Sequence, residues 1–357
     1  MSLNIAIEAI INNLYLFNSL KRYNDNNMCS DLDSGIASNK IISKKHHYLP
    51  VFYLNGFCNN DGLFYVFDKV KDDFLPKCSP ESKFFINNLN NYIHNGKPIF
   101  SYEESYFNKI DNLGSKALKE IIESDISIED NIPFKTKIDF IWFLTNLFWR
   151  APSANKTFVD IIQKEGLNNK YFGFYKGSPK NKLSDEDIPD IKKQIIDDDE
   201  IKKVFRTIVP SINSNINEMW RLLQVWNIFK IDNSHLITGD FPFVNNNSNL
   251  CLENIFDNFI FPISNNRLLM FGKDYPMFID SIVLSFINLS IFNSANRFVC
   301  CHKKELILDV IKHRNELSKN NKTESINVIL FKYLKIQSNF KSFDDYKKFV
   351  SGTNYKI

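Results

Sequence analysis

Apolar residues recur at helical spacing along much of the chain. Residues 5–20 and 103–123 place apolar side chains every three or four positions, as one face of a helix does. Residues 134–149 are apolar nearly all round, which is typical of a helix buried on every side. Further helices are expected at 212–229 and 277–293, and near the C-terminus. The pattern therefore predicts a mainly helical protein.

Short apolar runs bounded by Gly, Pro, Asn or Ser form a second pattern, which is typical of β-strands. The first run follows the turn signal Asp61-Gly62, and it is apolar on both sides, so we expect a strand buried on both faces. The other runs lie in the C-terminal half, at 235–240, 258–264, 267–272 and 297–301. We therefore predict an α+β fold, predominantly helical, with a small mixed or antiparallel sheet built from the N-terminal strand and the strands of the C-terminal half.

Polar stretches divide the chain into parts. Residues 1–40 are expected to form an N-terminal helix and a flexible linker, since the linker is polar and contains Gly and Ser. Residues 41–305 would form the main α+β domain, with a polar, charged excursion over its surface near 165–200. Within it, the acidic residues of "DDDEIKK" favour a helix start because they complement the helix dipole. Residues 306–357 would add C-terminal helices packed on the main domain.

A short helix is also predicted next to two adjacent histidines, in "KKHHYLPVFYLNGF". Pro50 suits the first turn of a helix, and Gly56 can close it in a left-handed conformation. His46 and His47 would then lie at the entrance to this helix. Because neighbouring residues of an extended segment point opposite ways, only one imidazole would face a cleft.

Composition limits the class of protein. Of 357 residues, 44% are hydrophobic and 33 are Phe, so a large aromatic core can form without disulfides. The formal net charge of +3 is too small for a general attraction to polyanions, so any nucleic-acid site would have to be local. The six cysteines show no repeated C-x-x-C spacing, which favours a cytoplasmic location. Export and membrane insertion are not indicated, because positive charge follows the first apolar stretch and no apolar run reaches about 20 residues.

Several short motifs follow one another in a fixed order. A segment "HHYLP" runs into an aromatic helix and a strand, and a helix with two spaced acids, "FWRAP", "LITGDFPFV", "IFPISNNRLLMF" and Asn293 with Arg297 follow. In this order, residues 44 to 305 resemble the bacterial family called domain of unknown function 4238. Two positions depart from the family pattern, since Asp111 stands where glutamate is more frequent and Phe241 where asparagine is usual. The resemblance implies a fold and a shared site, but no enzyme class.

His47 is the first candidate for that site, because its spacing to Pro50 carries the resemblance. An imidazole can act near neutral pH as a general base, a metal ligand or a donor to phosphate. The alternative is structural: the ring caps the following helix or holds a buried carboxylate.

Asp240 and Arg150 are the next two candidates. Asp240 ends an apolar strand, which can hold a catalytic or metal-binding carboxylate rigidly, although Asp at this place is equally typical of a turn. Arg150 ends an apolar helix, where its planar fork can clamp a phosphate or carboxylate. The alternative for Arg150 is a structural ion pair, since a buried guanidinium needs a carboxylate partner such as Glu104 or Asp240.

Glu104 and Asp111 lie seven residues apart, on one face of a helix and about 10 Å apart along its axis. They cannot chelate one ion alone, so a divalent ion such as Mg²⁺ or Mn²⁺ would also need Asp240 or His47. The alternative is a solvated helix face. A zinc site at "CCH", a phosphate loop, a dinucleotide fingerprint and a serine-hydrolase elbow are not indicated.

Two functions of different classes fit these residues. The favoured one is a metal-assisted phosphodiesterase, similar to a nuclease, which would suit a bacterial phage-defence or toxin-like system. Its catalytic residues would be His47, Glu104, Arg150 and Asp240, and its metal ligands Glu104, Asp111 and Asp240. The alternative is a non-catalytic module that binds nucleic acid, a small ligand or a partner protein, with the same residues in a structural ion-pair network. A third possibility confines function to the 165–200 excursion.

Overall fold

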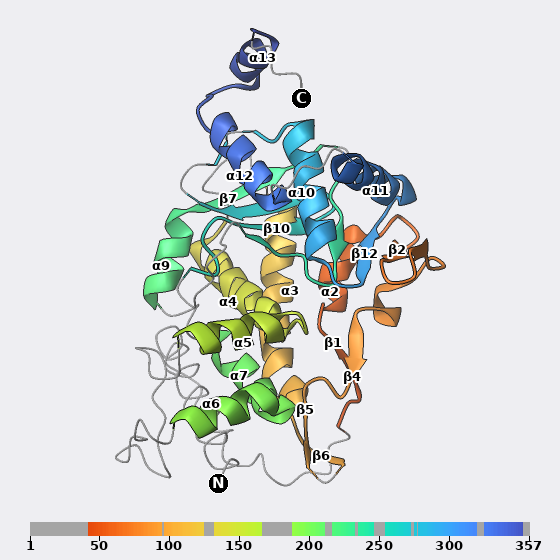
Figure 1. Ribbon diagram of the computed structural model, residues 1–357, viewed down its shortest axis with the longest axis vertical. Helices are drawn as coiled ribbons and strands as arrows, with labels where there is room; N and C mark the ends of the chain where they lie inside the picture. Colours follow the sequence, from red (N-terminus) through yellow and green to blue (C-terminus); the bar gives the residue numbers. More distant parts are fainter. Residues whose placement is uncertain are drawn as a thin grey trace.

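An antiparallel sheet forms the central layer of the protein, with helices on both of its faces (Figure 1). In this computed structural model the strand order is β7-β11-β10-β9, formed by Trp226–Lys230, Arg267–Phe271, Phe259–Ser264 and Val244–Asn245. The structure describes residues 42–94, 96–124, 132–165, 188–210, 216–232, 235–245, 254–272, 275–276, 278–319 and 325–352.

Alternate residues of the two central strands belong to two different cores. In β10, Phe259 and Phe261 lie in the core on the α3–α4 side, whereas Ile260 lies in the core on the α10 side. Every residue of β10 and β11 is buried. Because both faces of the sheet are covered, these strands appear in the sequence as continuous apolar runs instead of alternating ones.

The first face is covered mainly by two antiparallel helices, α3 (Asn108–Glu123) and α4 (Phe134–Arg150). They approach closely because Gly114 of α3 has no side chain: a Cβ there would lie 2.3 Å from the ring of Phe143. Smaller helices add to this side, namely α2 (Val51–Leu54), η1 (Asn55–Phe57), α5 (Ala154–Glu165) and α9 (Ile216–Gln224). A π-helical turn, η3 (Glu103–Phe107), leads into α3.

The second face is covered by α10 (Ser281–Ser294) and α12 (Ile326–Gln337), and α11 (Lys304–Lys319) and α13 (Phe343–Gly352) follow in the C-terminal part. A second sheet of order β3-β2-β12-β8 lies beside them, formed by Asp73–Phe74, Tyr65–Asp68, Phe298–Cys301 and Thr238–Gly239. All its pairs are antiparallel. Gly239 allows β8 to approach β12, because a Cβ there would lie 3.1 Å from the carbonyl oxygen of Phe298.

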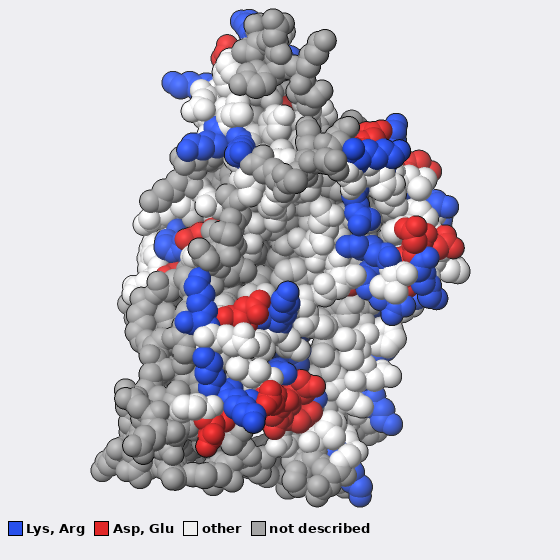
Figure 2. All heavy atoms as spheres, in the orientation of Figure 1, with Lys and Arg blue, Asp and Glu red and all other residues white. Residues whose placement is uncertain are grey.

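Two small strand pairs lie with α6 and α7 in the lower part of Figure 1. The pairs are β1 (Lys45–His47) with β4 (Phe85–Asn87), and β5 (Asn91–His94) with β6 (Lys97–Ser101); the helices are α6 (Ile188–Asp197) and α7 (Asp199–Ile208), and a 3-10 turn, η2, spans Pro80–Ser82. Figure 2 shows Asp and Glu side chains gathered over α6 and α7 on this face. Four of them line an open surface pocket of about 510 Å³, which contains no candidate residue: Asp197, Asp198, Asp199 and Glu200.

The predicted α+β class and the helices at 103–123 and 134–149 are confirmed. One helix prediction is wrong in part, because residues 226–229 of the expected 212–229 helix belong to β7. These residues pair in register with β11, so sheet formation overrides the local helical spacing. A second correction concerns Gly56, which is not left-handed but continues in the 3-10 turn η1. It is small there because a Cβ would lie 3.1 Å from Ser264 Cβ.

Several short strands between residues 73 and 101 escaped the sequence patterns, because each has only two to five residues. The expected helix at 5–20, its linker and much of the 165–200 excursion lie outside the described residues. No helix in the described ranges combines the length and the apolar character needed to cross a membrane.

Candidate functional site

Arg150 is the last residue of α4, and its side chain is 1% exposed. The helix ends there because Ala151 is extended, as a residue before proline prefers to be. Phe107 lies two turns before Gly114 on α3, and Arg150 two turns after Phe143 on α4, so the close helix pair brings Phe107 opposite Arg150. The guanidinium carbon lies 5.1 Å from the centre of the Phe107 ring, a cation–π contact.

Asp111 is the ion-pair partner of Arg150. Its Oδ2 accepts from Nη1 at 3.0 Å, and its side chain is 20% exposed. The other edge of the guanidinium is different: Nε and Nη2 are buried and have no acceptor within the described part of the chain. Oδ1 of Asp111 is likewise buried and unpartnered there. The ion pair therefore neutralises the charge of Arg150 but leaves the donors Nε and Nη2 unsatisfied.

His47 lies near Arg150, whereas its neighbour His46 does not act in the site. Burial lowers the pKa of His47, and the positive charges of Lys45 and Arg150 act in the same direction. The imidazole is therefore neutral at pH 7, since its ordinary pKa is about 6.5. Its Nε2 contacts the carbonyl oxygen of Glu81 at 3.3 Å, which leaves Nδ1 as the nitrogen that can take a proton.

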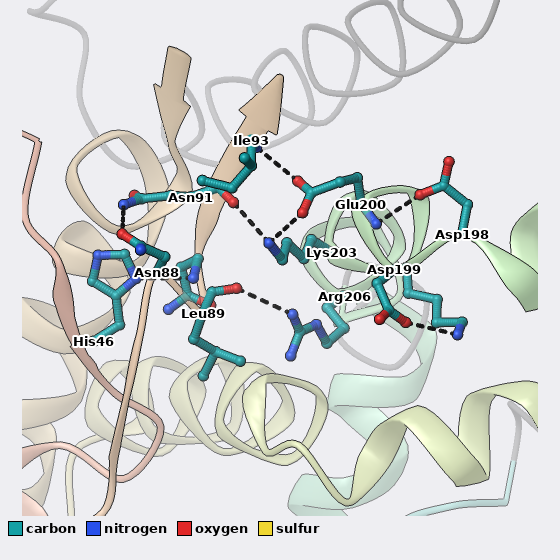
Figure 3. A network of polar contacts seen from close by, with 12 residues as sticks. His46, Asn88, Leu89, Asn91, Ile93, Asp198, Asp199, Glu200, Lys203 and Arg206 are labelled. Carbon is teal, nitrogen blue, oxygen red and sulfur yellow. Dashed lines mark hydrogen bonds and ion pairs between the residues drawn. The ribbon is translucent and has the colours of Figure 1, made fainter. Parts of the chain in front are cut away.

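His46 is completely buried, and both of its ring nitrogens are used. Nδ1 accepts from the backbone N–H of Asn90 at 2.9 Å, and Nε2 donates to the carbonyl of Ser43 at 2.9 Å. Figure 3 shows the polar network that continues from here to α7. In it, Lys203 donates to the carbonyl of Asn91 at 2.9 Å, and Glu200 accepts from the backbone N–H of Ile93 at 2.9 Å. His46 is thus part of a structural network.

Glu104 lies in the π-helical turn η3 and holds the segment that leads to the histidines. Its Oε1 accepts from the backbone N–H of Ser43 at 3.0 Å, while Oε2 is buried and has no partner among the described residues. The preceding Glu103 accepts from the side chain of Asn90 at 2.8 Å. Glu104 therefore fixes the strand segment that carries both histidines and still has one free oxygen.

Asp240 directly follows the close approach at Gly239 and binds the backbone before β12. Its Oδ1 accepts from the N–H of Asn296 at 2.7 Å, and its Oδ2 from those of Arg297 at 2.8 Å and Phe298 at 3.0 Å. Burial raises the pKa of Asp240, and the three N–H groups act against this rise. Both oxygens are occupied, so the structure gives Asp240 the turn-stabilising role that the sequence left open.

Arg297 forms the second arginine–carboxylate pair of the region, with Asp68 at the end of β2. Nε lies 3.3 Å from Oδ1 and 3.1 Å from Oδ2, and Nη2 lies 2.9 Å from Oδ2. Arg297 lowers the pKa of Asp68, and bonds from the N–H groups of Val70 and Lys71 add to this effect. Asp68 is 1% exposed, whereas the side chain of Arg297 is 48% exposed.

One contact and one electrostatic effect join the surroundings of the two arginines. Asn296 donates its side-chain N–H to Oγ of Ser153, just after α4, at 2.5 Å. Tyr48, next to His47, is buried, and its pKa is raised by burial and by the charge of Asp240 while Arg297 opposes the rise. The motifs around His47, Arg150, Asp240 and Arg297 therefore converge.

The predicted metal ligands do not form a common ligand set. In the described ranges, no three His, Cys, Asp or Glu side chains are placed to hold one metal ion. Asp240 accepts three backbone N–H bonds, Asp111 pairs with Arg150, and Glu104 binds Ser43.

The sequence patterns did not identify three residues that take part in these contacts. Asp68 ends a strand without any flanking motif, and Tyr48 lies between two motif positions. Asn293, which is exposed on α10, was matched to the motif instead of Asn296. Only Asp68 had a usable signal, because a lone carboxylate after a strand buried on both faces needs a cationic partner.

The fold and the site together define an α+β protein in which several charged side chains, some paired and some partly paired, lie in one region. The family model described as "Protein of unknown function (DUF4238)" matches residues 45–305, and the chain belongs to this family. Neither a curated protein nor a solved structure matches the chain.

Proposed function

We propose that the protein binds a phosphate-bearing ligand, a nucleotide or a nucleic acid, through the unpaired edge of Arg150. The observation that carries this proposal is a guanidinium 1% exposed whose Nε and Nη2 lack an acceptor in the described ranges. A buried donor left unsatisfied costs about 1–3 kcal/mol, and more when it is charged. An acid group with two oxygens would satisfy both donors at once.

Arg297 supplies a model for this binding inside the same protein. Its Nε and Nη2 lie on one edge of the guanidinium and together hold the carboxylate of Asp68. The same two atoms are the ones without a partner in Arg150. Phosphate fits such a fork as well as carboxylate does. His47, close enough for its titration to respond to Arg150, adds a second group able to donate to a phosphate oxygen when protonated.

The test is a calorimetric titration with 5′-AMP and with a short single-stranded DNA that carries a 5′-phosphate. Arg150→Met should weaken binding of both by about tenfold or more, since a bidentate charged contact exceeds 1.4 kcal/mol. Lys119→Met is the matched control, because it also removes one cation but from an exposed pair with Glu123. Equal affinities for wild type and Arg150→Met would refute the proposal.

A second candidate function is phosphodiester cleavage, as the sequence favours, and His47 is the observation in its support. A neutral imidazole with a free Nδ1 can accept a proton from an attacking hydroxyl or water. The test follows an end-labelled oligonucleotide with Mg²⁺, with Mn²⁺ and with EDTA. Cleavage that disappears in His47→Gln but persists in Asp309→Asn, an exposed residue of α11, would establish the enzyme; absence of cleavage in all three conditions would leave the binding module.

A further inference from the structure

A surface groove of about 350 Å³ lies between α3 and the short helical segment formed by α2 and η1. One wall of the groove consists of Phe52, Asn55 and Gly56. The other wall is a single face of α3, since its residues stand at i, i+3, i+4, i+7 and i+8 along the helix. These residues are Ser115, Leu118, Lys119, Ile122 and Glu123.

Both walls of the groove are fixed to the turn between β10 and β11. The backbone N–H of Asn265 donates to the carbonyl of Gly56 at 2.9 Å, and a Cβ at Gly56 would lie 3.1 Å from Ser264 Cβ. On the other wall, Nη2 of Arg267 donates to the carbonyl of Ile122 at 3.4 Å. The groove is therefore preformed, as small-molecule sites usually are, and its volume lies at the lower end of their range of about 300–1,000 Å³.

The floor of the groove is apolar. Leu118 is 3% exposed, and the partly buried side chains of Phe52 and Ile122 pack against the same hydrophobic core. Phe52 also packs against Phe143, with the two ring centres 5.3 Å apart. An aromatic ring beside branched aliphatic side chains suits a flat ring system, because heteroaromatic rings stack on such residues.

The rim of the groove is polar, and its charges cancel. Lys119 and Glu123 form an exposed ion pair, with 3.9 Å between Nζ and Oε1, so the rim selects no net charge in a ligand. Asn55 and Ser115 add an amide and a hydroxyl, and each of these groups can both donate and accept. A ligand that fits floor and rim is therefore neutral and flat, and it presents a donor next to an acceptor. Adenine has this pattern at its N6 amino group and N7, and an asparagine amide pairs with both at once.

We infer that the groove binds an adenine ring, as a nucleoside or as the base of a larger ligand. The ring lies on Phe52, Leu118 and Ile122, and the Asn55 amide accepts from N6 and donates to N7. This site is separate from Arg150, so the inference goes beyond the proposed function and does not depend on it.

The experiment uses adenosine, which carries no phosphate, and inosine, in which a carbonyl replaces the N6 amino group. Calorimetric titration of the full chain should show binding of adenosine and about tenfold weaker binding of inosine, because inosine lacks the N6 donor. Asn55→Leu should weaken adenosine binding by about tenfold and remove its preference over inosine, since leucine keeps the bulk of the side chain without its amide. The matched control is Asn315→Leu, which removes an exposed asparagine of α11 and should change neither affinity.

A second variant blocks the groove. Ser115→Phe places a ring between the two walls and should abolish adenosine binding, whereas Ser318→Phe, at an exposed position of α11, should not. Thermal unfolding of both variants checks that each is folded.

The outcomes distinguish this inference from the proposed function. No binding of adenosine at concentrations up to about 1 mM would overturn the inference, and so would unchanged adenosine binding in Ser115→Phe. Equal affinities for the two nucleosides, or a preference that survives in Asn55→Leu, would overturn it as well. Binding of 5′-AMP without binding of adenosine removes this inference and leaves the proposed function standing. The expected pattern of adenosine binding supports the inference whatever the result with Arg150→Met.

Discussion

The same edge of the guanidinium, formed by Nε and Nη2, is paired in Arg297 and unpaired in Arg150. Arg297 is 48% exposed, and its Nε and Nη2 are filled by the carboxylate of Asp68. Arg150 is 1% exposed, and the same two atoms have no acceptor in the described part of the chain. The Arg297 pair compensates a buried carboxylate, since Asp68 is 1% exposed. The buried guanidinium of Arg150 has no such complete partner, and this difference is the basis of the proposal that Arg150 binds a ligand.

The largest change in stability is expected when the carboxylate that holds the backbone around Arg297 is removed. Asp240→Ala would leave the N–H groups of Asn296, Arg297 and Phe298 without their acceptor. We expect a loss of about 3 kcal/mol in the free energy of unfolding, since each buried unsatisfied donor costs about 1–3 kcal/mol and two of these residues are exposed. Urea unfolding measures it, with Asp309→Ala as the control. A change as small as that of the control would contradict a structural Asp240.

The next largest change in stability is expected when the ion pair between Arg297 and Asp68 is removed. Arg297→Met should lower the free energy of unfolding at pH 7 by less than Asp240→Ala does, because solvent screens the exposed guanidinium while the buried carboxylate of Asp68 loses its cationic partner. The pKa of Asp68 is lowered in the folded protein, chiefly by Arg297. This stabilisation is therefore complete above the unfolded value of about 3.9 and is lost as pH falls through the folded pKa. The difference between wild type and variant should shrink below about pH 4, and a constant difference across the acid range would show that Asp68 is not its source.

The two sides of the comparison were not equally visible in the sequence. Arg150 was identifiable because an arginine that ends an all-round apolar helix before a proline must be buried and must have a partner. The expected partner, Glu104 or Asp240, was wrong: the ion pair is with Asp111, because Gly114 brings α3 against α4, which helix spacing alone does not show. Arg297 was matched to a motif without its partner, since Asp68 lies 229 residues earlier in sequence.

The fold shows the same limit. Long helices such as 134–149 were predicted because their periodicity is a local property of the chain. The strand 226–230 was missed because its conformation is set by pairing with 267–271, which no local pattern records. Likewise the sequence left open whether Asp240 is a turn residue or a metal ligand, because its oxygens accept from the N–H groups of residues 296–298, which lie far away in the sequence.

A smaller change in stability is expected at Arg150, whose guanidinium is only partly paired. Arg150→Met removes one ion-pair contact with Asp111 but also removes two unsatisfied buried donors, and methionine fills much of the volume. We expect the free energy of unfolding to stay within about 1 kcal/mol of wild type, because these terms offset one another. Thermal and urea unfolding of Arg150→Met and Arg297→Met side by side provide the measurement. A larger loss for Arg150→Met than for Arg297→Met would reverse the comparison.

The smallest stability effect is expected at His47, where a half-buried ring makes one contact of 3.3 Å with the carbonyl of Glu81. His47→Gln should change the free energy of unfolding by less than about 0.5 kcal/mol at pH 7. Because the pKa of His47 is lowered in the folded protein, its charged form is disfavoured there, and wild type should lose stability relative to the variant as pH falls below about 6.5. A phosphate on Arg150 would oppose this trend, since the protonated ring then faces an anion. The ratio of wild-type to variant affinity for 5′-AMP should therefore rise as pH falls from 7.5 to 5.5, and the titration of the phosphate itself cancels in that ratio. A ratio independent of pH would show that His47 does not contact the ligand of Arg150.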